Sequence, residues 1–344
     1  MKWMCKMGSA ERPSNLIYVS DDMPGISRKL LRKKFVFFDP DGQRITDAEE
    51  IARLNRIALP PAYTDAWYAP ADNAHILATG IDAKGRKQYR YHPDFRTQQE
   101  ARKFDGCSAF ARRLPLIRQR VEADLNTRGA NRERALASIV RLLDTGGIRI
   151  GNEAYAKANK SFGATTLRMR HAKVAGNTLH LHFRAKSGKQ CSMRVSDRGL
   201  ARFVRAMQDL PGQRLFQYVD DAGEVVPISS SDVNDYIRET MGGDFTAKDF
   251  RTWTASTIAF ETIHAAPADL NKQEVLEAVS GRLGNTPAIA RKSYIHPAVL
   301  SALDAQSDVR GLRLPRATRW LSRHERGLVE YLDAQPESRL LLCA

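Results

Sequence analysis

The stretch "NRERALASIVRLLDTGG", residues 131–147, sets the character of the larger part of this chain of 344 residues. Asn131 can cap a helix, and Gly146 with Gly147 can end it. Between them, apolar residues recur at the i, i+3, i+4 and i+7 positions of one helical face, namely Leu136, Ile139, Val140 and Leu143. The pattern predicts an amphipathic helix with one face buried in a core.

Most of the sequence after residue 96 is of this helical kind. The apolar spacing predicts further helices at about 197–210, 231–240, 247–265, 272–283 and 287–295, and a last one from about 316 with Leu321, Leu328 and Leu332 on one side. One β insertion interrupts them: "NTLHLHFRAKSGKQCSMRV", residues 177–195, alternates apolar and polar residues around a tight turn. We therefore expect a helical domain that carries a β-hairpin.

The residues before 96 are β-rich by the same criteria. "KKFVFFDPDGQRI", residues 33–45, is an apolar run, a turn and a second strand. The segment 87–92 alternates polar and aromatic side chains, after which the composition becomes polar and compatible with a helix. The sequence thus predicts an α+β protein of two domains, a β-rich domain over 1–96 and a mainly helical domain over 97–344.

The charge balance points to a polyanionic partner. The chain has 54 Lys and Arg against 39 Asp and Glu, a net charge of +15. Such an excess favours nucleic acid as the partner, although an enzyme that is merely basic is the alternative. The four cysteines form no C-x-x-C pair, which suggests neither a zinc site nor a disulfide framework and fits a cytoplasmic location. No apolar run approaches ~18 residues, so we expect no membrane span. The first residues, "MKWMCKMGSAERPSN", lack a continuous apolar stretch, so we expect no secretory signal.

Several sequence motifs of phosphoryl transfer are absent. "GIDAKGRKQ", residues 80–88, lacks the Lys-Ser/Thr of a nucleotide-binding P-loop, and no H-E-x-x-H or cluster of acidic residues spaced for two metal ions occurs. Attack on a phosphodiester without a metal builds negative charge that guanidinium groups and a neutral donor must stabilise. It also needs a nucleophile and a proton donor for the leaving oxygen. Such chemistry would require two arginines, a lysine, a neutral donor and a tyrosine, and we expect no metal and no cofactor.

Three cations are candidates for this chemistry. Arg149 follows a predicted helix end and stands beside Gly151, where backbone can approach a ligand closely; the alternative is a surface arginine. Lys186 lies at the predicted hairpin tip, where most lysines are simply solvated. Arg251, in "KDFRTW", stands between two aromatic residues; it is either half-buried and directed at a ligand or part of a cation–π pair on the surface.

Two further candidates lie in "LGNTPAIARKSYIHP", residues 283–297. Asn285 precedes Thr286, a predicted N-cap, and Pro287, a predicted first helical residue. Asn285 itself is either a ligand-binding amide or a capping residue. Tyr294, nine positions later, is either a nucleophile or a core tyrosine.

The order of these five residues resembles the catalytic pentad of type IB DNA topoisomerases, in particular the small bacterial, poxvirus-like branch. "IRIGNE" at 148–153, "KDFRTW" at 248–253 and the stretch from "LPPAYTDAWYAP" to "HPDFR" at 59–96 also resemble motifs of that family. The resemblance runs from about residue 24 to about 335, nearly the whole chain. Asn285 stands where eukaryotic and poxviral members commonly have histidine; an amide can donate a hydrogen bond there but cannot carry a charge.

The resemblance implies a fold, an activity and roles for the five residues. Tyr294 would attack a DNA phosphodiester and form a 3′-phosphotyrosyl intermediate, while Arg149, Arg251 and Asn285 hold the non-bridging oxygens. Lys186 would protonate the leaving 5′ oxygen, a task that Arg149 could share. Strand rotation and religation would then relax supercoiled DNA without ATP or metal. The catalytic domain would have the tyrosine recombinase/topoisomerase IB fold.

The resemblance also implies how DNA is held. The two domains would clamp duplex DNA, and four residues match family positions that touch it: Gln88, Tyr89, Tyr91 and Tyr155. Tyr89 and Tyr91 share one strand face, and the alternative is that one of them belongs to the core. We expect a monomer that acts in the cytoplasm, associated with the nucleoid.

Two rival interpretations use the same residues. A tyrosine recombinase usually has histidine three residues before the second arginine, where this chain has Lys248, and a β-rich first domain fits recombinases poorly. A DNA-binding protein with a decayed active site is the other rival. Against it, none of the five positions holds an inert residue.

Overall fold

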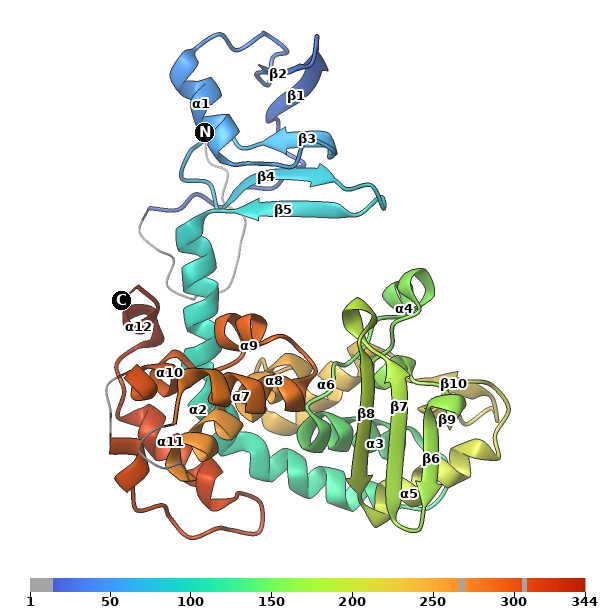
Figure 1. The fold of residues 1–344 in the computed structure, drawn as a ribbon. Helices are drawn as coiled ribbons and strands as arrows, with labels where there is room; N and C mark the ends of the chain where they lie inside the picture. The colour runs from blue at the N-terminus through green and yellow to red at the C-terminus, as the bar shows by residue number, and fades with distance from the viewer. Residues whose placement is uncertain (1–14, 266–269, 305–307, 344) are drawn as a thin grey trace. The chain divides into compact units, whose positions relative to one another are not determined.

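The computed structural model describes residues 15–265, 270–304 and 308–343. By its internal contacts the chain divides into two units, Met1–Ala101 and Arg102–Ala344. Each unit has a hydrophobic core of its own. The first unit is built on a sheet and the second mainly on helices (Figure 1), so the predicted α+β class is confirmed.

An antiparallel sheet with the strand order β2-β1-β3-β4-β5 forms the first unit. Its strands are β1 (Ile26–Leu31), β2 (Lys34–Phe38), β3 (Thr64–Tyr68), β4 (Ile76–Ile81) and β5 (Lys87–Tyr91). Helix α1 (Ala48–Arg56) was not predicted; Asp47 caps it by accepting a hydrogen bond from Glu50 N at 3.1 Å. Only Leu54 of this short helix is fully buried, in the core with Phe37 and Tyr68, and Ile51 packs partly buried against the same core.

Helices form most of the second unit. The longest, α2 (Pro93–Leu125), begins directly after β5 and continues into the second unit. The other α-helices are α3 (Arg132–Gly146), α4 (Glu153–Asn159), α5 (Arg198–Gln208), α6 (Ser230–Met241), α7 (Ala247–Ala265), α8 (Lys272–Leu283), α9 (Pro287–Ser293), α10 (Pro297–Asp304), α11 (Arg323–Asp333) and α12 (Ser338–Cys343). The predicted ends of α3 are confirmed: Asn131 Oδ1 accepts from Arg134 N at 2.8 Å, and Gly147 takes φ 59°.

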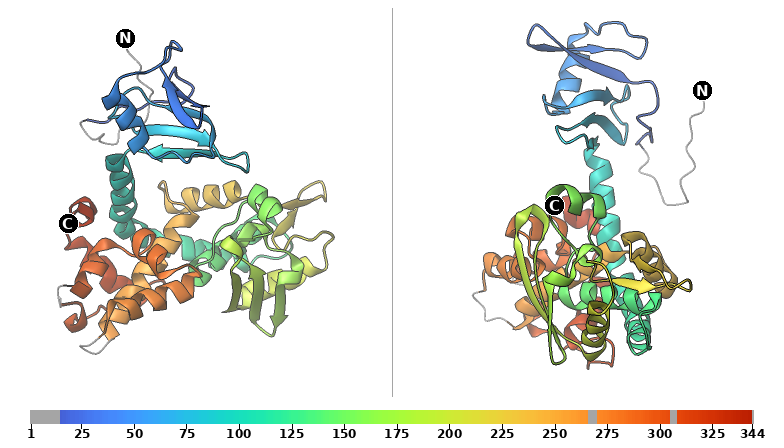
Figure 2. Two further views of the ribbon diagram at one scale, coloured as in Figure 1. Left: turned by 45° about the horizontal axis from the view of Figure 1, so that its top comes forward. Right: turned by 90° about the vertical axis from the view of Figure 1, so that its right-hand side faces the viewer.

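The predicted β insertion is an antiparallel sheet of β6 (Ala172–Ala175), β7 (Thr178–Arg184) and β8 (Gln190–Ser196). The inner face of β7 is buried through Leu179, Leu181 and Phe183, as the alternation predicts. The views in Figures 1 and 2 agree in placing this sheet beside α3 and α5. A separate short hairpin joins β9 (Gln217–Val219) and β10 (Val225–Pro227).

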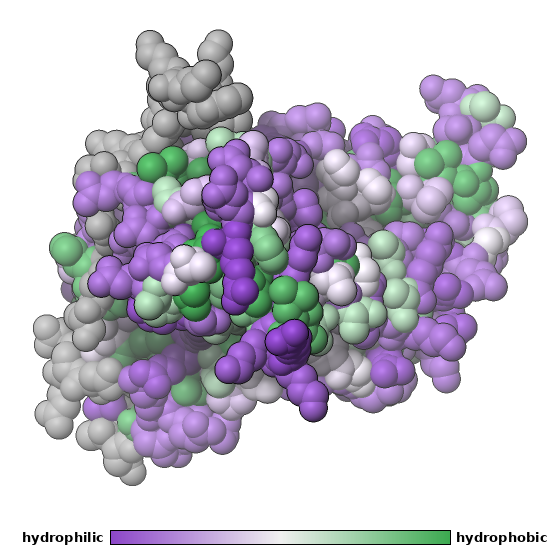
Figure 3. All heavy atoms as spheres, turned by 90° about the horizontal axis from the view of Figure 1, so that it is seen from above, coloured by the Kyte–Doolittle hydropathy of each residue, from purple (hydrophilic) through white to green (hydrophobic). Residues whose placement is uncertain are grey.

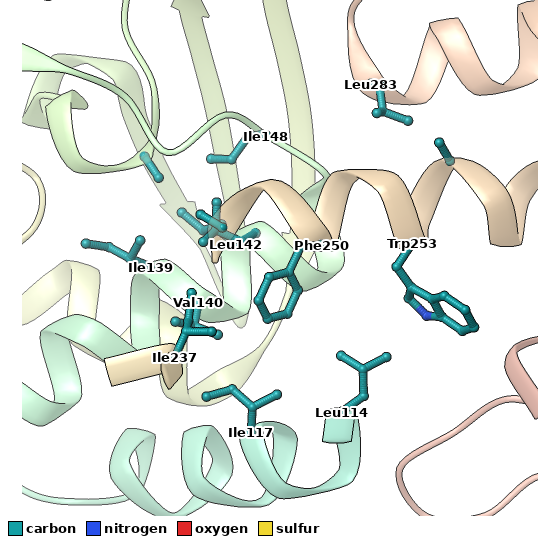
Figure 4. Close-up of a cluster of buried hydrophobic side chains, with 14 of the residues drawn as sticks. Leu114, Ile117, Ile139, Val140, Leu142, Ile148, Ile237, Phe250, Trp253 and Leu283 are labelled. Atoms are coloured by element: carbon teal, nitrogen blue, oxygen red, sulfur yellow. The ribbon is translucent and has the colours of Figure 1, made fainter. Parts of the chain in front are cut away.

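Helix α7 runs through the core of the second unit. Figure 4 shows Phe250 and Trp253 pointing from α7 towards Leu114 and Ile117 of α2. All four side chains are almost completely buried. Because consecutive helical residues point in different directions, this packing turns Arg251, between the two aromatic residues, to another side of α7.

The last long helix corrects one prediction. We expected it to begin near residue 316 with Leu321 on its apolar face, but α11 begins at Arg323. Ser322 Oγ accepts from Glu325 N at 3.1 Å while Glu325 Oε2 accepts from Ser322 N at 2.8 Å, a capping box that fixes the start. Leu321 therefore lies before the helix, whereas Leu328 is buried within it.

The face of the protein shown in Figure 3 is mainly hydrophilic, as its content of charged residues leads one to expect. Hydrophobic side chains form scattered groups on the same face (Figure 3). None of the helices in the described residues is long and apolar enough to cross a lipid bilayer.

A buried ionic network joins the helices of the second unit. Arg118 of α2 donates to Asp144 of α3 at 2.8 Å and to Glu325 of α11 at 2.6 Å. Trp253 Nε1 of α7 donates to the same Glu325 carboxylate at 3.2 Å. The side chains of Arg118 and its two acidic partners are all less than a fifth exposed, so these charges depend on one another for solvation.

We expect Arg118→Met to destabilise the second unit by about 3–5 kcal/mol, because it leaves two carboxylates buried without a cation. Urea unfolding measures the change. Arg319→Ala is the matched control: Arg319 pairs with Glu122 at 3.0 Å, but its side chain is 71% exposed, so the expected loss is below about 1 kcal/mol. Equal losses in the two variants would contradict this account of the network.

Candidate active site

The buried guanidinium group of Arg251 lies at the centre of the candidate site. Arg251 is only 3% exposed. Its Nη1 donates to Gly147 O at the end of α3, and its Nη2 donates to Leu283 O at the end of α8, at 3.2 Å. Carbonyl groups at helix C-termini carry partial negative charge, which compensates part of the cost of burying the cation. The surface-pair interpretation of Arg251 is therefore wrong.

Tyr294 lies directly against this cation. The Arg251 Cζ atom is 4.8 Å from the centre of the Tyr294 ring. The ring comes from the C-cap position of α9, where Tyr294 N still donates to Ala290 O at 3.1 Å. The tyrosine is half-buried rather than enclosed in the core, and its ring lines a cavity.

Arg149 reaches the same cavity from a tightly held loop. Ala164 N donates to Arg149 O at 2.9 Å, and Thr165 N donates to Ile150 O at 2.8 Å. Gly151 takes φ 98°, and a Cβ on Gly163 would lie 2.6 Å from Arg149 O. The glycines thus let two backbone segments meet, so the close approach that we predicted at Gly151 is to the protein's own chain.

Lys186 occupies the hairpin turn, as predicted. It begins the 3₁₀ turn Lys186–Gly188 between β7 and β8, in which Ser187 has a left-handed φ of 63°. The lysine is exposed, yet it lines the cavity that also holds Tyr294. Arg184 O accepts from Phe162 N at 2.8 Å, which ties this hairpin to the segment that follows α4.

Asn285 lies beside these groups but is not among the residues that line the two cavities described below. Thr286, not Asn285, caps α9 by accepting from Ile289 N at 3.3 Å, so the capping interpretation of Asn285 is wrong. The side chain is 93% buried (7% exposed), and neither amide atom has a hydrogen-bond partner among the described residues. Its backbone oxygen accepts from Lys189 of the hairpin at 2.9 Å.

Arg149 and Arg251 line two adjoining cavities. One, of about 420 Å³, is also lined by Tyr294, Lys186 and Tyr155. The other, of about 950 Å³, extends along the β7–β8 hairpin to the turn after α8. Neither has an aspartate or glutamate among its lining residues, so both are strongly cationic. Four of the five predicted residues thus share one concave basic site.

The cations change the acidity of the tyrosine. Burial alone would raise the pKa of the Tyr294 phenol. The charge of Arg251 opposes that effect, and the charges of Arg149 and Lys186 add to it. Together they lower the pKa of Tyr294 below its usual 10.0. The arrangement favours the phenolate, the form that attacks an electrophile.

The cavity contains residues that sequence reasoning did not select. Lys248 lines it one helical turn before Arg251, a spacing that could have identified it on the same face of α7. Cys191 of β8 lines the larger cavity, where burial raises the pKa of its thiol. No group of three or more His, Cys, Asp or Glu suited to a metal ion occurs in the described part of the chain.

The predicted DNA-contact residues lie in both units. Tyr89 and Tyr91 on β5 are 42% and 38% exposed and stack with ring centres 5.7 Å apart, so the interpretation of one as core is wrong. Gln88 is half-buried and donates to Asp82 at 3.1 Å. Tyr155, in α4, lines the cavity with Tyr294.

Comparison with known proteins identifies the family of the chain. Residues 92–307 match the family described as "Eukaryotic DNA topoisomerase I, catalytic core", and residues 34–82 match "Bacterial DNA topoisomerase IB, N-terminal domain". A DNA topoisomerase 1B of Acanthamoeba polyphaga mimivirus is 31% identical over 287 residues, 79% of this chain and 85% of the relative. This chain belongs to the type IB DNA topoisomerases. A more distant relative, DNA topoisomerase 1 of Mycosarcoma maydis, is 27% identical over 195 residues, 49% of this chain and 19% of the relative.

Membership of the type IB topoisomerases decides between the rival interpretations. The catalytic-core match covers the whole segment that carries Arg149, Lys186, Arg251, Asn285 and Tyr294. The chain is therefore a DNA-binding isomerase rather than a recombinase or a protein without activity, and the match in the first unit supports the bacterial branch.

We expect Arg149→Met to raise the pKa of Tyr294, because it removes one of the charges that stabilise the phenolate. Titration of carbon-labelled tyrosine by NMR measures the shift, with Tyr294→Phe to assign the signal. Arg168→Met is the matched control, since Arg168 lies over the Phe162 ring at 5.6 Å and does not contribute to the Tyr294 shift. A Tyr294 signal unchanged by Arg149→Met would contradict the proposed electrostatic coupling.

Proposed function

We propose that this type IB topoisomerase relaxes supercoiled DNA through a 3′-phosphotyrosyl intermediate on Tyr294, without ATP or metal. The observation that carries the proposal is the position of the Tyr294 ring, 4.8 Å from the Arg251 guanidinium, in a cavity that Arg149 and Lys186 also line. A phenol beside three cations is suited to attack a phosphodiester, whose own charge the same cations neutralise.

The cleavage step transfers the phosphoryl group of the DNA strand from the 5′ oxygen to the Tyr294 oxygen. The Tyr294 phenol gives its proton to solvent water, and the phenolate oxygen forms a bond to phosphorus as the bond from phosphorus to the 5′ oxygen breaks. Arg149 and Arg251 stabilise the negative charge that builds on the non-bridging oxygens, because guanidinium groups bind such oxygens through paired N–H donors. The unpaired buried amide of Asn285 supplies a further donor to one of them.

The leaving oxygen needs a proton, and Lys186 is placed to give it. Lys186 is on a hairpin turn and lines the same cavity as Tyr294. Arg149 is the second candidate for this role. Religation reverses the step: the 5′ hydroxyl attacks phosphorus and the phenolate of Tyr294 leaves. Each step exchanges one phosphoester for another of similar energy, which removes the chemical need for ATP.

Duplex DNA is the proposed partner, bound largely through its phosphates. The net charge of +15 and the basic cavities support this, and such binding weakens steeply as salt rises. Gln88, Tyr89, Tyr91 and Tyr155 are proposed contacts; the stacked exposed pair offers flat aromatic faces and hydroxyl donors. We propose that the protein acts as a monomer in the cytoplasm, associated with the nucleoid.

We expect the wild-type protein to relax supercoiled plasmid in EDTA without nucleotide. Tyr294→Phe should abolish relaxation and the covalent intermediate, because the nucleophile is gone. Arg149→Ala and Arg251→Ala should each slow cleavage by about 10²–10³-fold, the usual loss for one preorganised donor. Gel electrophoresis of topoisomers measures the rate. Tyr218→Phe, outside the cavity, is the matched control that should stay active; relaxation by Tyr294→Phe would refute the nucleophile.

We expect Lys186→Ala to cleave ordinary DNA slowly but to cleave DNA with sulfur in place of the bridging 5′ oxygen at nearly the wild-type rate. A thiolate leaves without a proton donor, so this substrate does not need the general acid. Arg149→Ala in parallel measures how much of that role Arg149 shares. A defect in Lys186→Ala that is equal on both substrates would exclude Lys186 as the proton donor.

A further inference from the structure

The backbone on both sides of Tyr294 is held by side chains of two other helices. Lys103 Nζ of α2 donates to Ser293 O at 2.9 Å. Ser256 Oγ of α7 lies 3.4 Å from Tyr294 O and accepts from His296 N at 2.9 Å. The chain turns sharply here, since α9 ends at Ser293 and α10 begins at Pro297. The path of this short linker decides where the Tyr294 ring points.

His296 is the most constrained residue of the linker. It is 4% exposed, and its Nδ1 accepts from Ala298 N at 3.1 Å in the first turn of α10. Its Nε2 lies 3.3 Å from Ser338 Oγ of α12, and its ring packs edge-on against Phe104 of α2 at 5.4 Å. Because Nδ1 accepts, Nε2 carries the proton and donates to Ser338. Burial lowers the pKa of His296 to about 4, so the ring is neutral at physiological pH.

The same contacts connect the linker around Tyr294 to α7, the helix that carries Arg251. Ser256 Oγ also lies 2.9 Å from Thr252 O, one turn back along α7 and next to Arg251. Ser256 therefore joins the linker to Thr252, the residue directly after Arg251. A shift at His296 would pull its N–H away from Ser256 and move the tyrosine relative to Arg251.

We propose that His296 is a positioning residue for Tyr294: its two ring hydrogen bonds fix the linker, so that Ser256 holds the backbone of Tyr294 where the phenol ring lies against Arg251. The inference rests on Tyr294 being the nucleophile proposed above. His296 does not touch the cavity that Tyr294 lines, so it acts through the backbone and not on the substrate. An error of about 1 Å in placing a reacting group can cost ~10²-fold in rate.

Two substitutions at this position separate hydrogen bonding from packing. His296→Phe keeps an aromatic ring against Phe104 but removes both hydrogen bonds. His296→Asn keeps an acceptor for Ala298 N, as asparagine does at helix N-caps. Single-turnover cleavage of a radiolabelled duplex is measured across pH, with DNA affinity and melting temperature measured for each variant.

We expect His296→Phe to cleave about 10²-fold more slowly at neutral pH with unchanged DNA affinity. The rise of its cleavage rate with pH should move to higher pH, because a phenol displaced from Arg251 loses the charge that lowers its pKa. His296→Asn keeps the bond to Ala298 N but loses the one to Ser338, so it should recover only part of the rate and reverse only part of the shift in the pH profile. His264→Phe is the control: this histidine of α7 lies 3.0 Å from Leu312 O, away from the linker, and its loss should affect stability alone.

A stably folded His296→Phe with the wild-type rate and pH profile would overturn the proposal, as would a slower rate with an unshifted profile. Should that variant fail to fold, Ser338→Ala decides: it removes only the partner of Nε2, and a shifted profile supports the proposal while an unshifted one overturns it. Tyr294→Phe separates the two levels of the argument. If that variant still cleaves DNA, the proposed nucleophile fails; if it is inactive, the His296 results test positioning alone.

Discussion

The burial of one guanidinium group constrains the whole catalytic unit. Arg251 can be buried only because the ends of two helices supply carbonyl oxygens to it, Gly147 from α3 and Leu283 from α8. Each of these carbonyls stands two residues before a candidate catalytic residue, Arg149 in one case and Asn285 in the other. The hydrogen bonds that stabilise the buried cation therefore also fix the backbone just before Arg149 and Asn285. Tyr294 completes the arrangement by covering the guanidinium with its ring.

The site is arranged at a cost in stability. Burial and the nearby charge of Arg149 both lower the pKa of Arg251, which means that the free protein holds this cation unfavourably. The buried amide of Asn285 has no partner among the described residues, at a typical cost of about 1–3 kcal/mol. A phosphodiester bound in the cavity would offset the cost at Arg251, since it brings negative charge to a cation that lines the cavity. Such local cost is typical of sites preorganised for a ligand.

Local sequence signals predicted many of the helix ends in this structure, but contacts between residues far apart in the sequence were not predicted. Asn131 and Thr286 cap the starts of helices and Gly147 caps the end of one, as their residue types indicate, because capping depends only on the neighbouring turn. The predicted start of α11 was wrong because the prediction followed the apolar spacing and not the capping box at Ser322. The network around Arg118 links residues more than 200 positions apart, for which no sequence spacing gives a signal.

The candidate site shows the same division. Order along the chain and resemblance to a family identified the five residues, and the structure brings Arg149, Lys186, Arg251 and Tyr294 to one cavity. The same reasoning left both arginines open as surface residues, since burial of a charge depends on what packs around it. Lys248 was passed over although its spacing from Arg251 places both on one face of α7, whereas the contacts of His296 have no signal in the sequence. Exposure of both Tyr89 and Tyr91 was likewise not decided by strand alternation, because β5 is the edge strand of its sheet.

The central claim is that the Tyr294 oxygen becomes joined to the 3′ phosphate of a cleaved strand. Trapping the protein on nicking-prone duplex DNA, digesting the complex with trypsin and nuclease, and sequencing the modified peptide by mass spectrometry tests it most directly. The account predicts one nucleotide adduct, linked through its 3′ phosphate, on the peptide that contains Tyr294. An adduct on any other residue, or one linked through a 5′ phosphate, would contradict it.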